Sequence, residues 1–322
     1  MNNFSKYLNL FFNDYLILQL NCSDKTIDSY KYAFKLLLNY LITEKKIKLK
    51  NIDFNVLTKD NIKDFLNYLE NDRNCSIETR NQRLAAIKSF FQFVGIEKIE
   101  YLNEVQGILN IKSKKVIIKE MDYLTLEEID FFFEKMPKNK RKDRRNYVFL
   151  VLLYDSAARL EELLNAKVYN IKLDNEPSII LFGKGGKERN VPIMDKTAEL
   201  VKQYINENKL CDSSYLFCNS RGEKLNPRTI QKMIKDKNTT TKKITPHSFR
   251  RSRAIHLLEA GVDIIYIRDL LDHASVVTTE RYAKASPKYK NKMLAKAYPD
   301  VFSDMETSWN QDKDLLEELL KY

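Results

Sequence analysis

The chain has 322 residues, of which 43% are hydrophobic and 31% are charged, and its formal net charge is +11. This length fits two domains with cores of their own, and the apolar content excludes an intrinsically disordered chain. The excess of positive charge favours a polyanionic partner such as nucleic acid.

Cysteine and histidine usage argues against a metal site. The four cysteines are scattered without a CxxC pair, and none of the three histidines stands at metal-ligand spacing from a cysteine. Structural zinc sites use such pairs. The chain also shows neither a secretory signal nor an apolar run long enough to cross a bilayer. We therefore expect a soluble, cytoplasmic protein with no metal, no cofactor and no membrane partner.

Residues 1–110 have the periodicity of amphipathic helices. Apolar residues recur at steps of three and four along 27–41, 62–69 and 77–94. This pattern predicts helices that share one core. Gly95 is a natural C-cap residue and predicts the end of the third helix.

Basic side chains accompany the first and the third of these helices. A solvated helix face would explain them by itself. Beside the net charge of +11 they also suit contacts with DNA phosphates, which fix position without reading sequence. The candidates for such contacts are Lys25, Lys31, Arg80, Arg83 and Lys88.

Helical periodicity lapses in residues 111–122, IKSKKVIIKEMD, where four lysines appear. We expect a basic interdomain linker here, with Lys114 and Lys115 as further candidates for DNA contact.

Residues 123–299 combine helices with short strands. Thr125 and Glu128 form a capping-box pattern that starts a helix, and a buried helix breaks near Ser156. The β-branched runs VYNIKL, SIILF and ERNVPI predict a small antiparallel sheet with GKGG as a hairpin turn. Further helices are expected at 196–208, 226–235, 246–260, 263–271 and 278–298.

Two cationic clusters precede the later helices. Arg159 stands in a segment that otherwise looks buried, so it needs an anionic partner, either Glu162 or a phosphate. Lys184 stands at the hairpin tip, where a mobile charge suits proton delivery to a leaving oxygen. Lys187 and Arg189 are further hairpin cations that would bind phosphate or face solvent. An intrahelical ion pair and a solvated turn are the plainer explanations of these clusters.

A third cluster lies in TPHSFRRSR. The Thr-Pro pair at 245–246 is typical of an N-cap and first helical turn. His247 and Arg250 then project from one face at the positively polarised end of this helix, which favours an anion. Downstream, LDHASVVTTERY places His273 nine residues before Tyr282.

In their order and spacing, the arginine, the hairpin lysine, the HxxR pair, the second histidine and the tyrosine resemble the tyrosine recombinase family of integrases and Xer resolvases. The resemblance covers essentially the whole chain. It implies a mainly α fold with a SAM-like helical core-binding domain at 1–110, a linker at 111–122, a mixed α/β catalytic domain with a small antiparallel sheet at 123–299, and a tail at 300–322. The implied catalytic residues are Arg159, Lys184, His247, Arg250, His273 and Tyr282.

The resemblance also implies a function. The chain would be a site-specific DNA recombinase that forms a covalent 3′-phosphotyrosine intermediate, either as a mobile-element integrase or transposase or as an Xer-like resolvase. Its partners would be double-stranded DNA core sites and other copies of itself, as a dimer on one site and a tetramer in the synaptic complex. The tail ends in DLLEELLKY, an apolar-sided segment that would dock on its own body or on a neighbouring copy. No accessory protein is identified by the sequence.

The chain departs from the family pattern at two places. The family often has glycine before the second histidine, where this chain has Asp272. The family often has Thr-Gly before the first arginine, where this chain has Ala157 and Ala158. Neither departure removes a catalytic group.

Two other functions remain open at this point. One is a type IB topoisomerase-like nicking and closing enzyme that acts as a monomer. The other is a catalytically silent DNA-binding regulator with the same fold. Supercoil relaxation without site preference would favour the first, and site binding without a covalent adduct would favour the second.

Overall fold

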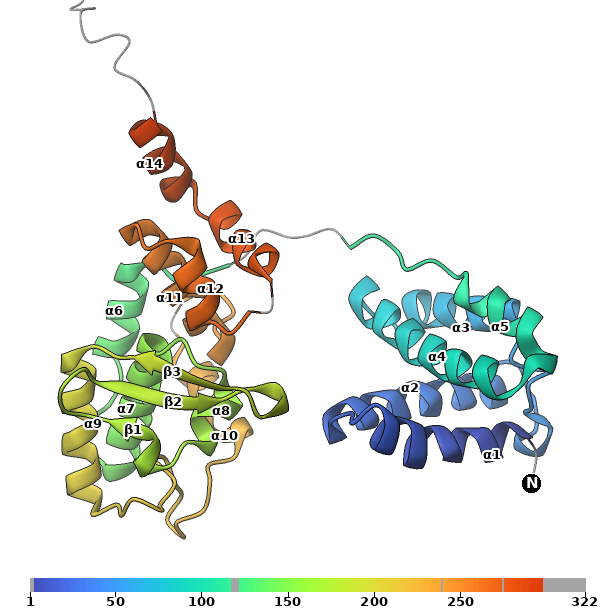
Figure 1. Cartoon of the computed structure of the whole chain (residues 1–322), viewed down its shortest axis with the longest axis horizontal. Coiled ribbons are helices and arrows are strands. Elements are labelled where there is room, and N and C mark those ends of the chain that lie inside the picture. Colours follow the sequence, from blue (N-terminus) through green and yellow to red (C-terminus); the bar gives the residue numbers. More distant parts are fainter. Residues whose placement is uncertain (1–2, 117–121, 239, 274, 298–322) are drawn as a thin grey trace, which may run out of the picture. The chain divides into compact units, whose positions relative to one another are not determined.

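Figure 1 shows the computed structural model of the chain, which describes residues 3–116, 122–238, 240–273 and 275–297. The chain divides into two compact units, Met1–Lys119 and Glu120–Tyr322. The tail at 300–322 and its DLLEELLKY segment lie outside the described residues.

The first unit is all helical. Its elements are α1 (Asn3–Leu10), the π-helix η1 (Phe11–Gln19), α2 (Asp24–Thr43), η2 (Leu49–Asn51), α3 (Lys59–Asn71), α4 (Ile77–Glu97), η3 (Ile99–Tyr101) and α5 (Leu102–Leu109). Ser23, Thr58 and Ser76 cap α2, α3 and α4 because each side chain accepts a hydrogen bond from a backbone N–H of the first turn.

Aromatic rings fill the core of this unit. Phe90 lies at its centre, with its ring centroid 5.4 Å from that of Phe11, 5.2 Å from that of Phe34 and 5.4 Å from that of Phe91. All four side chains are almost completely buried. Edge-to-face packing of this kind adds to the free energy of area burial.

The predicted end of the third helix at Gly95 is wrong. Gly95 lies inside α4, which continues to Glu97. A Cβ at position 95 would stand 3.0 Å from Cγ1 of Val105. The glycine therefore serves the close approach of α5 to α4, and tertiary packing outweighs its tendency to end a helix.

The second unit packs helices against a small sheet. Its elements are α6 (Leu126–Glu134), α7 (Arg141–Asp155), α8 (Leu160–Asn165), η4 (Val168–Asn170), β1 (Ile171–Lys172), β2 (Ser178–Phe182), η5 (Lys184–Gly186), β3 (Glu188–Pro192), α9 (Asp195–Asn208), α10 (Pro227–Lys237), α11 (Pro246–Ala260), α12 (Ile264–Leu270), α13 (Val276–Ala285) and α14 (Pro287–Ala297). Both units together confirm the predicted fold class, which is mainly α with one small antiparallel sheet.

The sheet has the strand order β1-β2-β3, and both pairs are antiparallel. Ile179 pairs with Val191 and Leu181 with Arg189. Ile179, Leu181 and Val191 are fully buried and share an apolar core with Phe149 of α7. The turn between β2 and β3 contains the predicted GKGG sequence, where Gly185 and Gly186 adopt positive φ angles of 78° and 75°.

A separate apolar cluster connects the segments that carry the candidate catalytic residues. It contains Ala157 after α7, Ile255 of α11, Leu271 after α12 and Tyr282 of α13. Tyr282 is 4% exposed. The candidate nucleophile is therefore seated in a packed layer and not on a free loop.

The helix expected at 278–298 is two helices, α13 and α14, separated at Ser286. Ser286 has φ −105° and ψ 104°, because a residue before proline is disfavoured in helical geometry and Pro287 follows it. The Ser286 hydroxyl donates to Glu259 of α11 at 2.6 Å and accepts from the backbone N–H of Tyr289 at 3.1 Å. The break thus fixes the end of α13 to α11.

Among the described helices, none combines the length and the apolar character that are needed to cross a bilayer.

Candidate active site

Arg159 lies at the end of a tight turn. After α7 the chain passes through Ala157, which adopts φ +48°, and Arg159 then forms the N-cap of α8. A non-glycine residue in this left-handed region is uncommon and carries a conformational cost. Ala157 is buried in the cluster around Tyr282, and its carbonyl accepts a hydrogen bond from Arg250 at 2.6 Å. These contacts offset that cost.

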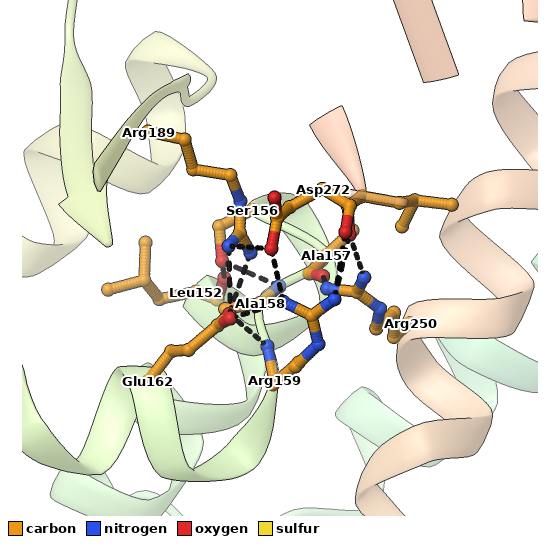
Figure 2. A network of polar contacts seen from close by, with 10 residues as sticks. Leu152, Ser156, Ala157, Ala158, Arg159, Glu162, Arg189, Arg250 and Asp272 are labelled. Carbon is orange, nitrogen blue, oxygen red and sulfur yellow. Dashed lines mark hydrogen bonds and ion pairs between the residues drawn. The ribbon is translucent and has the colours of Figure 1, made fainter. Parts of the chain in front are cut away.

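Figure 2 shows that the Arg159 guanidinium lies between two carboxylates. Nη1 is 2.6 Å from Glu162 Oε1 and 2.9 Å from Asp272 Oδ2. Nη2 donates to the carbonyl oxygens of Asp272 at 3.0 Å and Leu271 at 3.4 Å. The anionic partner expected for Arg159 is therefore present twice, although the Arg159 side chain is only partly buried.

Glu162 holds two arginines at once. It is 5% exposed, and its carboxylate accepts both arms of the Arg189 guanidinium, at 3.0 and 2.6 Å, as well as Nη1 and the backbone N–H of Arg159. Burial alone would raise the pKa of Glu162, but the hydrogen bonds from Arg189 and Arg159 outweigh it and hold the pKa below its usual range. Glu162 is thus a buried anion at neutral pH.

Arg250 projects from α11 and is 1% exposed. Its Nη1 donates to the carbonyl of Ala157 and its Nη2 to the carbonyl of Leu271. Burial, followed by the nearby charge of Arg159, lowers its pKa to about 10, so the group stays positively charged at neutral pH. Arg250 and Arg159 therefore meet at one carbonyl, that of Leu271.

His273 and Tyr282 follow this meeting point along the chain. Their rings stack with centroids 6.0 Å apart and an interplanar angle of 14°. The Nδ1 atom of His273 is 2.9 Å from the Thr279 hydroxyl. Burial and the charges of Arg250 and Arg159 lower the pKa of His273 to about 4, so its ring is neutral at physiological pH.

Burial raises the pKa of the Tyr282 phenol, while the charges of Arg250 and Arg251 act in the opposite direction. The phenol is therefore protonated in this state. To attack, it would need a proton acceptor and a positive environment. The charge of Arg250 makes the environment of the phenol more positive, and the neutral imidazole of His273 stacks on the Tyr282 ring.

The other two candidate catalytic residues are placed differently. His247 lies in the first turn of α11 and is exposed. Although its side chain reaches solvent, the surrounding chain partly desolvates the imidazole, and this desolvation, followed by the charges of Arg251 and Arg250, lowers its pKa. Lys184 begins the turn between β2 and β3, and its side chain lies outside the described part of the structure.

Arg189 was expected to bind phosphate or to face solvent. Its side chain is instead 11% exposed, and both arms of its guanidinium bind Glu162. A signal for this was present in β3. Val191, two residues later, faces the core, and strand residues two apart share a face. Lys187, which directly precedes β3, is exposed, as expected.

Of the candidates for DNA contact in the first unit, Arg80 differs most from its expected place. It is 6% exposed, and its Nη1 donates to Asn81 at 3.0 Å and to the carbonyl of Lys112 at 3.5 Å. It fixes the chain after α5 and is not presented on the polar side of α4. Position within a helical wheel did not reveal this, because the covering segment comes 32 residues later.

The remaining candidates keep at least part of their side chains in solvent. Arg83 is partly buried, donates to Ser29 and stacks 5.0 Å from the centroid of the Tyr32 ring. Lys114 binds Glu70 through both carboxylate oxygens at 2.8 Å. Exposed side chains are those of Lys25, Lys31 and Lys115, while that of Lys88 is partly exposed.

Among the described residues, no group of three or more histidine, cysteine or acidic side chains is placed to hold a metal ion.

Each of the two units matches the model of a known protein family. The model of the phage integrase family matches residues 122–288, and that of the phage integrase N-terminal SAM-like domain matches residues 9–101. An integrase/recombinase of Sinorhizobium fredii is 30% identical over 96% of this chain and 95% of its own length. Tyrosine recombinase XerC of Rickettsia massiliae is 32% identical over 88% of this chain and 94% of its own length.

Solved structures have the same fold. The XerH recombinase bound to a palindromic difH substrate matches with a TM-score of 0.66 at 24% identity, over 86% of this chain and 80% of that one. The Tn1549 transposon integrase with transposon right-end DNA matches with a TM-score of 0.67 at 14% identity, over 90% and 99%. The resemblance seen in the sequence is thereby confirmed, and the chain belongs to the phage integrase family of tyrosine recombinases.

Proposed function

We propose that this protein is a site-specific recombinase that cleaves and rejoins double-stranded DNA through a covalent 3′-phosphotyrosine intermediate. One observation carries the proposal. Arg159 and Arg250, from separate segments, both donate to the Leu271 carbonyl, two residues before His273, whose ring stacks on Tyr282. Charge for a phosphate and a nucleophile for phosphorus therefore converge on one turn.

In the proposed cleavage step, the Tyr282 oxygen attacks phosphorus and the bond between phosphorus and the 5′-oxygen breaks. The phenolic proton passes to the neutral imidazole of His273, and Lys184 donates a proton to the departing 5′-oxygen. Arg159 and Arg250, with His247, stabilise the charge that develops on the non-bridging oxygens. Rejoining reverses these steps with a 5′-hydroxyl of another strand, so the phosphoester energy is conserved without a cofactor.

Residues 1–110 would bind the DNA core site, and residues 123–299 would carry out the chemistry, joined by the basic segment 111–122. A lambda integrase structure that matches this chain with a TM-score of 0.64 is a dimer bound to a core site. We propose the same assembly here, as a dimer on one site and a tetramer in the synaptic complex. Its biological role would be that of a mobile-element integrase or an Xer-like resolvase.

The covalent intermediate can be tested with a suicide DNA substrate, in which a nick lets the cleaved strand diffuse away. The wild-type chain should give a protein–DNA adduct on a denaturing gel. Tyr282→Phe should give none, because it lacks the attacking oxygen, while DNA binding in a mobility-shift assay should be retained. An adduct with Tyr282→Phe would show that another residue is the nucleophile.

Arg159 and Arg250 should determine the rate of DNA cleavage. Arg159→Ala and Arg250→Ala should each slow single-turnover cleavage by roughly 10²- to 10³-fold, as other losses of a positioned charge-stabilising group do. Arg144→Ala is a suitable control, because Arg144 is exposed and pairs with Glu207 on the surface. Equal rates for Arg159→Ala and this control would contradict the assigned role.

A further inference from the structure

Asp272 lies in the turn between α12 and α13 and adopts φ +48°. Its backbone N–H donates to the Asp269 carbonyl at 3.0 Å. Glycine takes this conformation without strain, whereas aspartate takes it only at some cost. A residue kept in an unfavourable conformation beside a reactive site points to a function for its side chain.

The carboxylate of Asp272 is enclosed on the arginine side. Oδ2 is 2.9 Å from Nη1 of Arg159 and 3.9 Å from Nη1 of Arg189. A Cβ at Gly183, the residue that follows β2, would lie 3.0 Å from the same oxygen. The glycine thus leaves room for this carboxylate beside Arg159.

The two carboxylates on Arg159 are not equivalent. The Glu162 side chain is 4% exposed and is bound by Arg189 as well, whereas the Asp272 side chain is 29% exposed. The Arg159 side chain is itself 38% exposed. An anion arriving from solvent can therefore reach the place that Asp272 holds on Arg159, but not the place that Glu162 holds.

We propose that the Asp272 carboxylate is an internal competitor of the DNA phosphate for Arg159. This inference rests on the proposed function, because it assumes that a phosphate binds Arg159 during cleavage. A phosphate and a carboxylate on one guanidinium repel each other, so the phosphate has to displace Asp272. DNA bound along its full contact surface supplies more free energy for that displacement than a lone anion does, so a lone anion binds Arg159 more weakly while Asp272 is present. Asp272 thereby makes the active site selective for completely engaged DNA.

The experiment measures the affinity of the full-length chain for inorganic phosphate, from the rise of its melting temperature with phosphate concentration. Asp272→Asn keeps the shape and tolerates positive φ but removes the charge. Asp269→Asn is the matched control, because it changes the net charge equally and its side chain pairs with Arg268. We expect phosphate to bind Asp272→Asn roughly three- to tenfold more tightly than wild type, and Asp269→Asn to bind it as wild type does.

Asp272→Gly repeats the test without a side chain, so a folding defect of one variant does not decide the result. Equal phosphate affinity of all chains, or an equal gain in the control, overturns the proposal. Weaker binding by both Asp272 variants also overturns it, since Asp272 would then support Arg159 and not compete for it.

The phosphate measurement requires no DNA cleavage. A chain that forms no Tyr282 adduct but gains phosphate affinity in Asp272→Asn would refute the proposed function and leave the competition intact. A chain that forms the adduct but shows no gain would do the reverse. The two proposals therefore fail separately.

Discussion

The aromatic core of the first unit and the charged network around Arg159 both contain buried side chains, but those of the core are apolar and those of the network are charged. Phe90 and its neighbours need only be apolar and of suitable size to exclude water. Glu162 and Arg250 need a defined partner for each polar atom, because an unpaired buried charge is costly. The first region tolerates approximate shape, whereas the second depends on the placement of individual turns.

The largest change in stability should come from the aromatic core. Phe90→Ala should lower the free energy of unfolding of the first unit by about 3–5 kcal/mol, because it removes a large buried ring and leaves a cavity. Hydrogen–deuterium exchange should show faster exchange in α4 and unchanged exchange in α11. The control is Leu18→Ala, since Leu18 is 74% exposed, and a loss of similar size there would contradict the assigned core.

Removing the charge of Glu162 should cost the second unit somewhat less. We expect Glu162→Gln to lower its free energy of unfolding by about 2–4 kcal/mol. Arg189 loses the carboxylate that binds both arms of its guanidinium and keeps the longer contact with Asp272 at 3.9 Å, while Arg159 keeps Asp272 at 2.9 Å. Chemical denaturation measures this loss. Glu199→Gln, at an exposed position of α9 in the same unit, should change stability little.

The ion pair between Glu162 and Arg189 also makes the stability of the second unit depend on pH. The pKa of Glu162 is lower in the folded chain than its ordinary value of about 4.3. Its contribution to stability is therefore complete above that value and is lost as the pH falls through the lower folded pKa. The fall in stability below about pH 4.3 should be smaller in Glu162→Gln than in wild type, and an equal acid dependence of the two would argue against a charged Glu162.

The smallest effect should be that of a helix cap. Ser76→Ala removes the acceptor for the Thr79 backbone N–H and should destabilise α4 by about 1 kcal/mol. Ser76→Asn, which also caps, should restore most of this stability in the same denaturation assay. A larger loss in Ser76→Ala than in Glu162→Gln would reverse the order expected from the two regions.

Local signals in the sequence predicted local structure. Thr125 and Glu128 form the expected capping box, Thr245 caps α11, and this helix ends at Ala260 as expected, followed by Gly261 with φ +97°. These features depend on residues within one turn of helix, so they can be inferred without the rest of the chain. The same holds for the GKGG turn between two paired strands.

Contacts between distant segments could not be predicted in the same way. Burial of Arg80 depends on Lys112, and the environment of Arg159 depends on Asp272, 113 residues further on. No periodicity carries such information. The sequence did single out Asp272 as a departure from the family pattern, but only the structure showed that it binds an arginine.

The carbonyl of Leu271 accepts hydrogen bonds from both Arg159 and Arg250, and the chain that follows it leads directly to His273 and α13. Any displacement of this one peptide group changes the seating of two cations and of the segment that bears Tyr282 together. We therefore expect the positions of the two guanidinium groups and of Tyr282 to change together when this turn moves. If Tyr282 is the nucleophile that we propose, the charge for the phosphate and the attacking oxygen would then be positioned by one and the same peptide group.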